Sequence, residues 1–202
     1  MQPRRWAVLI PVAALVTGAL ALHSQSPARA AAPQFDSRGR LMLPKDYREW
    51  IFLSSGLGMT YGAPETNRQP NFDDVFVSPP AYREFVNAGH WPEHTVFILE
   101  QRRSSARGSV NGGSVGHYQS DLIGLSAAVK DSRRSPDGSG WAYFGFGLKT
   151  DPAPALPKTA ACYSCHGQNA AVENTFVQFY PTLLPVARAK GTLKPNFRKV
   201  IE

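Results

Sequence analysis

The sequence predicts an α+β fold, a single domain built on an antiparallel β-sheet with a few helices. Short β-branched and apolar runs alternate with turn residues, and neighbouring runs are close enough along the chain to pair directly. The 17 glycines and 17 prolines favour many turns over long helices. Hydrophobic residues make up 43% of the 202 residues and charged residues 18%, which is the composition of a chain with a core.

Each element is predicted from a local pattern: apolar β-branched runs for strands, proline at the start of helices, and glycine-containing turns. In chain order the elements are a short helix at 47–50, strands at 51–53 and 73–77, a helix at 81–87, strands at 95–100, 122–129 and 141–146, and helices at 173–180 and 182–189. A segment at 103–116, rich in Gly, Ser and Arg, is predicted to be an exposed hairpin loop. The aromatic residues of the last strand, Trp141, Tyr143, Phe144 and Phe146, are assigned mainly to the core.

Residues 1–31 have the order of a secretory signal peptide. Arg4 and Arg5 come first, an apolar run over residues 6–22 follows, and small residues lead to Ala30. This order of positive, apolar and small residues predicts cleavage near Ala30 and export to the periplasm.

The alternative to cleavage is a retained membrane anchor. The apolar run is short for a full membrane span, and Pro11 interrupts it. Cleavage is therefore preferred, and residues 32–202 are expected to form one mature domain that is soluble and has no membrane contact.

The formal charge of +7 has a limited meaning for binding. Three arginines of the signal region contribute to it, which leaves about +4 on the rest of the chain. The basic residues form two small clusters, Arg102, Arg103 and Arg107 in one and Arg133 and Arg134 in the other. Neither cluster is interleaved with the aromatic residues that a nucleic-acid site uses, so no nucleic-acid partner is expected.

The segment Cys162-Tyr163-Ser164-Cys165-His166 carries the chemistry of the sequence. It matches C-x-x-C-H, the attachment signature of c-type haem. Two intervening residues place the thiols about one helical turn apart, within reach of the two vinyl groups on one porphyrin edge. His166 then lies under the ring, where an imidazole nitrogen can bind the iron. The sequence therefore predicts one haem c, held by Cys162 and Cys165, with His166 as the metal ligand.

Three other roles for the two cysteines explain less of the sequence. A disulfide leaves His166 without a purpose, and a zinc site needs four ligands although the chain has no second cysteine pair. A thioredoxin-like redox motif needs a βαβ setting, whereas Pro152, Pro154 and Pro157 precede this motif.

The chain resembles the cytochrome P-460 family over roughly residues 43–184. The resemblance is carried by residues 161–166 and by the run Thr-Phe-Val-Gln-Phe-Tyr-Pro at 175–181, together with residues 140–144 and 118–131. It implies a β-rich domain with one haem, usually a homodimer, whose iron is five-coordinate with the motif histidine on one side and an open position on the other.

The resemblance implies two branches with different chemistry. Cytochromes P-460 proper oxidise hydroxylamine with a haem that is also cross-linked to a lysine from the first half of the domain. Cytochromes c′-beta lack that bond and bind nitric oxide in an apolar pocket lined by aromatic rings.

Lysine placement separates the two branches. No lysine lies between Lys45 and Lys130, and the strand at 95–100 offers Phe97 or Leu99 at the position in question. The later lysines, Lys130, Lys149 and Lys158, are expected on the surface or in loops. This pattern favours the c′-beta branch.

The distal pocket is the least determined part of the site. Phe76, Phe97 and Leu99 are the candidate lining residues, and core packing is the preferred role for the two phenylalanines. The rival polar residues are Glu100, His90, His94 and His117, of which His90 and His94 are expected to be exposed.

Three functions follow for the predicted haem. The first is binding of nitric oxide or a related small nitrogen oxide at an open iron. The second is hydroxylamine oxidation, and the third is electron transfer, which needs Met or His as a second ligand and has Met59 or Met42 as candidates. A redox partner protein is compatible with each.

Overall fold

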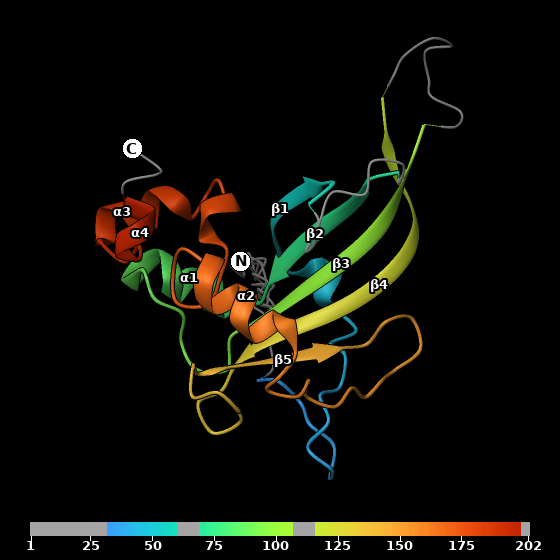
Figure 1. Ribbon diagram of the computed structural model, residues 1–202, viewed down its shortest axis with the longest axis horizontal. Coiled ribbons are helices and arrows are strands. Elements are labelled where there is room, and N and C mark those ends of the chain that lie inside the picture. Colours follow the sequence, from blue (N-terminus) through green and yellow to red (C-terminus); the bar gives the residue numbers. More distant parts are fainter. Residues whose placement is uncertain (1–31, 60–68, 107–115, 199–202) are drawn as a thin grey trace, which may run out of the picture.

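The computed structural model describes residues 32–59, 69–106 and 116–198, and these contain a five-stranded antiparallel sheet (Figure 1). The strands are β1 (Ile51–Leu57), β2 (Asn71–Val77), β3 (Val96–Ser105), β4 (Tyr118–Lys130) and β5 (Trp141–Gly145). Each strand pairs with the next one along the chain, in the order β1-β2-β3-β4-β5. The predicted α+β class with an antiparallel sheet is confirmed.

Short helices lie before, between and after the strands. They are η1 (Tyr47–Glu49), α1 (Pro79–Ala88), α2 (Ala161–Asn169), η2 (Val177–Phe179), α3 (Leu184–Lys190) and α4 (Pro195–Arg198). Pro79 and Pro80 occupy the first turn of α1, where the missing N–H groups cost nothing. Gly89 ends α1 with φ of +77°, a left-handed conformation that glycine adopts without strain.

The two faces of the sheet are covered by different parts of the chain. Helices α1, α2 and α3 lie on one face (Figure 1), where Phe85, Tyr163 and Ala187 pack with Trp141 and Tyr143 of β5. The segment before β1 covers the other face, where its buried Leu41, Tyr47 and Trp50 join the core formed by Ile98, Ala127, Val129, Ala142 and Phe144. Alternation along β5 thus sends successive side chains to opposite faces.

The expected helix at 173–180 is wrong. Only η2 is helical there, and residues 172–175 form a tight turn in which Glu173 has φ of +50°. The Thr175 N–H and hydroxyl both donate to the Val172 carbonyl, at 2.9 Å and 2.8 Å, and these short-range bonds replace the helical ones. The last predicted helix begins two residues later than expected, at Leu184.

The strands are longer than their apolar cores suggest. β1 continues through Gly56 to Leu57, and β3 runs on to Ser105, so the predicted loop at 103–116 begins as paired strand. Ladder hydrogen bonds extend a strand through residues whose side chains alone would not predict it. Residues 107–115 of that loop, and the predicted signal peptide at 1–31, lie outside the described residues.

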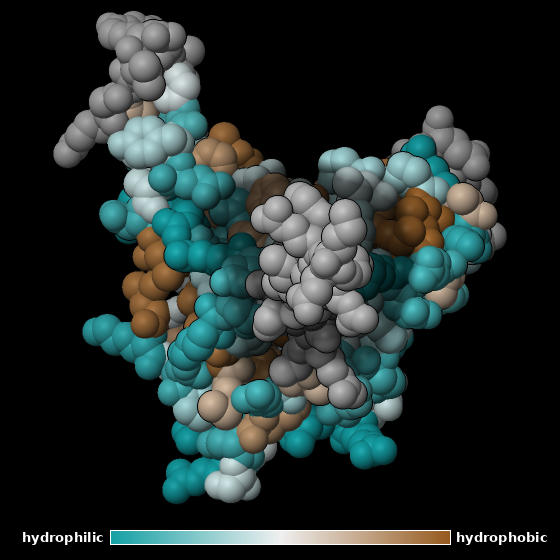
Figure 2. Space-filling view, turned by 180° about the vertical axis from the view of Figure 1, so that it is seen from behind, coloured by the Kyte–Doolittle hydropathy of each residue, from teal (hydrophilic) through white to brown (hydrophobic). Residues whose placement is uncertain are grey.

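The described surface carries scattered large hydrophobic residues, including Phe52 and Leu57 of β1, which are 52% and 48% exposed. Figure 2 shows hydrophobic residues in separate patches, with hydrophilic residues between them. Within the described ranges, every helix is too short or too polar to cross a membrane.

Candidate functional site

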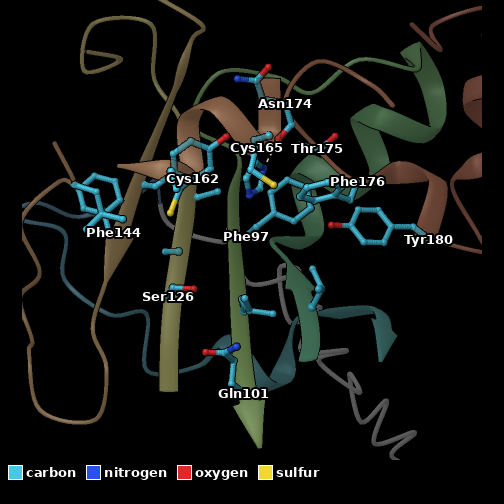
Figure 3. Close-up of a pocket in the computed structure, with 18 residues that line it drawn as sticks. Phe97, Gln101, Ser126, Phe144, Cys162, Cys165, Asn174, Thr175, Phe176 and Tyr180 are labelled. Atoms are coloured by element: carbon cyan, nitrogen blue, oxygen red, sulfur yellow. Dashed lines mark hydrogen bonds between the residues drawn. The ribbon is translucent and has the colours of Figure 1, made fainter. Parts of the chain in front are cut away.

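A cavity of about 310 Å³ lies between α2 and the sheet (Figure 3). This volume falls within the roughly 300–1,000 Å³ of typical cofactor and ligand pockets. The walls are contributed mainly by apolar residues of β2, β3, β4, β5, α2 and the segment that follows α2: Val75, Phe97, Leu99, Gln101, Ser126, Ala127, Ala128, Tyr143, Phe144, Leu156, Ala161, Cys162, Cys165, His166, Asn174, Thr175, Phe176 and Tyr180.

Strand register builds the sheet wall of this cavity. Val75 is paired with Leu99, and both line the cavity. Phe97 and Gln101 lie two residues to either side of Leu99 on β3, so alternation brings all three to one face. In Figure 3, Phe97 and Gln101 lie along the same strand below the two cysteines.

Helix α2 supplies the opposite wall and both cysteines. Cys162 and Cys165 are three residues apart, which places their side chains on one side of the helix. The two thiols are not joined in a disulfide, and both line the cavity. Tyr163 anchors the helix because its ring packs edge-on against Tyr143 at 4.9 Å and its hydroxyl donates to the Leu156 carbonyl at 3.2 Å.

His166 is oriented by a backbone carbonyl. Its Nδ1 lies 2.7 Å from the carbonyl oxygen of Asn174, and because a carbonyl can only accept, Nδ1 carries the proton. The lone pair is therefore on Nε2, the atom left to bind a metal. Burial lowers the pKa of His166, which keeps the imidazole neutral near pH 7. The rings of Tyr143 and Phe176, each 4.6 Å away, hold the imidazole plane.

The residues present fit a covalently attached haem. The donor set consists of two thiols one turn apart and one neutral imidazole with its lone pair on Nε2. Tyr143 is 4% exposed, lines the cavity, and its hydroxyl makes no hydrogen bond within the described residues. A buried hydroxyl without a partner in a cofactor-sized cavity indicates that a polar group of a ligand belongs next to it.

One acidic side chain stands close to the cavity, and the sequence did not reveal it. Gln101 Nε2 donates to Asp73 Oδ1 at 2.9 Å, and Asp73 is 7% exposed. Burial raises the pKa of the Asp73 carboxyl, and the nearby Asp74 adds to the rise. The sequence feature that could have revealed Asp73 is the pair of adjacent acids, Asp73 and Asp74, inside an otherwise apolar strand. Such a pair is unusual in a strand that is covered on both faces.

Two of the three predicted pocket residues line the cavity. Phe97 and Leu99 do so, whereas Phe76 lies on the other face of the sheet, with its ring 5.7 Å from Tyr47 and 5.6 Å from Phe52. The reason is register: Phe76 pairs with Ile98, whose side chain points away from α2. Glu100 shares that face and is likewise remote from the cavity.

The other candidate ligands are not brought to the cavity. His90, His94 and His117 are exposed, as are Met42 and Met59, at 44% and 43%. Lys45 pairs with Asp151 and Lys130 with Glu173, while Lys149 and Lys158 are exposed. Among the described residues, none of these side chains lines the cavity.

Comparison with known protein families gives a match over most of the described chain. The family model described as cytochrome P-460 matches residues 44–177, which covers β1 through β5, the cysteine motif and the turn that follows it. No curated protein sequence matches this chain significantly.

Proposed function

This chain belongs to the cytochrome P-460 family of c-type haem cytochromes, and from that premise we propose that Cys162 and Cys165 hold its haem and His166 binds the iron. The support is the geometry of α2, which turns both thiols and the imidazole toward one cavity. When bound, the haem supplies an iron that can take a small ligand or exchange an electron.

The proposed activity is reversible binding of nitric oxide or a related small nitrogen oxide. The main support for this proposal is the composition of the cavity lining. The described residues that line the cavity include His166 but no other histidine, and no methionine or lysine. His166 would hold the iron, and no other described histidine, methionine or lysine of the cavity would compete with a small ligand for it. The polarity of the surrounding residues would then decide between binding and activation of that ligand.

The chain's own residues prepare this site in two ways. The Asn174 carbonyl fixes the proton of His166 on Nδ1, so Nε2 would be the donor to the iron. Val75, Phe97 and Leu99 form an apolar sheet wall, which excludes water and charged ligands while admitting a small neutral molecule.

Hydroxylamine oxidation is the second candidate, and the Asp73–Gln101 pair favours it. Removing electrons from hydroxylamine also releases protons, which need an acceptor near the reacting nitrogen. Asp73 has a raised pKa and contacts a cavity residue, so its carboxylate can take such a proton. Against this candidate, no described lysine lines the cavity to supply a further bond to the haem. Electron transfer is the third candidate, and no methionine or second histidine is among the described residues that line the cavity to favour it.

Export and assembly complete the proposal. The signal-like order of residues 1–31 supports export to the periplasm, with residues 32–202 as the mature domain. The resemblance to the family supports a homodimer, and an exchangeable electron calls for a redox partner protein. Light scattering coupled to size exclusion measures the first of these, and a monomer at micromolar concentration would reject it.

The attachment is tested by replacing Cys162 and Cys165 together by serine, with Ser164→Ala as the control on the same helix. The double variant should lose all haem on denaturation, whereas the control should keep the mass of one haem on the chain. Titration of the reduced wild type with nitric oxide then tests the activity. Saturable binding at one site per haem is expected, and no spectral change would reject gas binding.

A further inference from the structure

The turn that orients His166 is held by an ion pair from a distant part of the chain. Lys130, the last residue of β4, donates to Glu173 Oε2 at 2.8 Å and to the Trp91 carbonyl at 2.7 Å. Glu173 Oε1 in turn accepts the Trp91 N–H at 3.2 Å. The side chains of Lys130 and Glu173 are 19% and 21% exposed, so solvent screens their attraction weakly.

Trp91 closes the network from the other side. Its indole Nε1 donates to Thr175 Oγ1 at 2.9 Å, and the indole is 2% exposed. The turn from Val172 to Thr175 is therefore held by hydrogen bonds at two side chains, the carboxylate of Glu173 and the hydroxyl of Thr175. His90 also faces Glu173 Oε1, at 3.6 Å, but its side chain is 62% exposed.

These hydrogen bonds stabilise an unfavourable backbone conformation at Glu173. Its φ of +50° lies in the left-handed region, which residues with a side chain seldom adopt. A residue stays in such a conformation when its surroundings over-determine it. The Glu173 carboxylate makes two of the bonds that do so here, one to Lys130 and one to Trp91. The next residue, Asn174, supplies the carbonyl that accepts the Nδ1 proton of His166.

We propose that Lys130 and Glu173 are positioning residues, whose ion pair fixes the Asn174 carbonyl and thereby sets the orientation and donor strength of His166. This inference rests on the proposed role of His166 as the iron ligand. A firmly held acceptor at Nδ1 gives the imidazole more negative character and strengthens its bond to iron. A turn free to rotate its peptide groups weakens that hydrogen bond and, with it, the bond to the metal.

The experiment compares Lys130→Met with Lys149→Met in the haem-loaded protein. Both changes remove one ammonium group and keep a flexible apolar stem, but Lys149 is exposed and lies outside the network. The readouts are the iron–histidine stretching band of the reduced protein in resonance Raman spectra and the reduction potential. Lys130→Met should lower the stretching frequency and raise the potential, because a weaker donor stabilises the oxidised iron less. Lys149→Met should change neither.

Two further variants test the same ion pair from its other side and by charge restoration. Glu173→Gln retains an acceptor for the Trp91 N–H but loses the charge, and it should shift the band in the same direction as Lys130→Met. Lys130→Arg retains the charge and should restore the band toward the wild-type frequency. An unchanged band in both Lys130→Met and Glu173→Gln would overturn the inference, even if both variants unfold more readily, because the pair would then be merely structural. A wild type without any iron–histidine band would instead overturn the proposed role of His166.

Discussion

Two buried carboxylates, Asp73 and Glu100, lie on opposite faces of the paired strands β2 and β3. They differ in their hydrogen-bond partners and in the direction of their pKa shifts. Burial by itself raises the pKa of Glu100, but hydrogen bonds from Tyr47, Arg102 and Arg48 outweigh it and leave the pKa lowered. Burial also raises the pKa of Asp73, and there the single hydrogen bond from Gln101 does not reverse the rise.

The difference distinguishes the closed face of the sheet from the face that borders the cavity. On the face covered by the segment before β1, the charge of Glu100 meets two guanidinium groups and a hydroxyl, and the core around it is closed. On the face toward α2, Asp73 has one amide partner next to an open cavity. Buried acids whose burial is not offset by hydrogen bonds or opposite charges are common at binding and catalytic sites. The raised pKa of Asp73 therefore supports a site on the α2 face.

The largest expected effect on stability comes from removing the charge of Glu100. Glu100→Gln removes the charge and leaves Arg48 and Arg102 facing an amide. Removing one partner of a buried ion pair costs roughly 3–5 kcal/mol, and the partial exposure of Arg48 places this case at about 3 kcal/mol. The unfolding midpoint of the haem-loaded protein should fall by roughly 6–12 °C. A fall below about 2 °C would show that Glu100 is not the structural anchor of this face.

Ile98 and Leu99 are adjacent on β3 and point to opposite faces of the sheet. Substituting each one compares the two faces directly, with a smaller expected effect on stability. Ile98 is fully buried on the closed face, and Ile98→Val should cost about 1 kcal/mol in urea unfolding. Leu99 lines the cavity, so Leu99→Val should cost less stability but change the association rate of carbon monoxide with the reduced haem. If Ile98→Val altered that rate and Leu99→Val did not, the assignment of the two faces would be reversed.

The smallest effect concerns Asp73 and appears in the pH dependence of stability. The folded pKa of Asp73 is raised above 3.8, so the folded state holds the proton longer and stability falls as the pH rises through this interval. Asp73→Asn should remove that fall and become relatively more stable than wild type as the pH rises above 3.8.

Glu100 provides the opposite sign as the internal control. Its folded pKa is lowered below 4.5, so its contribution is present above pH 4.5 and disappears as the pH falls through the folded value. Urea unfolding at several pH values between about 3 and 7 covers the usual range of carboxyl titration and measures both slopes. Slopes of equal sign for the two residues would contradict the comparison.

The sequence predicted the fold class well, because that class depends on local patterns. The C-x-x-C-H motif is also a local pattern, and its role in holding a haem stays a prediction. Apolar runs separated by turn residues marked the five strands, and C-x-x-C-H needs no tertiary context to be recognised. The helix expected at 173–180 failed because contacts of Glu173 with Lys130 and Trp91, more than 40 residues away, hold a turn there.

The lining of the cavity depends on strand register, which a single sequence does not specify. Phe76 and Phe97 look equivalent in their strands, but Val77, not Phe76, pairs with Phe97. A shift by one residue moves a side chain to the other face, so Phe76 joins the closed core while Phe97 lines the cavity. Asp73 was missed for the same reason, since its partner Gln101 becomes a neighbour only through strand pairing.

The visible absorption spectrum of the purified haem-loaded protein, ferric and then reduced, tests the central claim most directly. A five-coordinate, high-spin haem c is expected in both states, because His166 is the one histidine among the described cavity residues and no described methionine or lysine joins it there. A low-spin spectrum with sharp visible bands would contradict it, since a second side chain would then occupy the position proposed to be open.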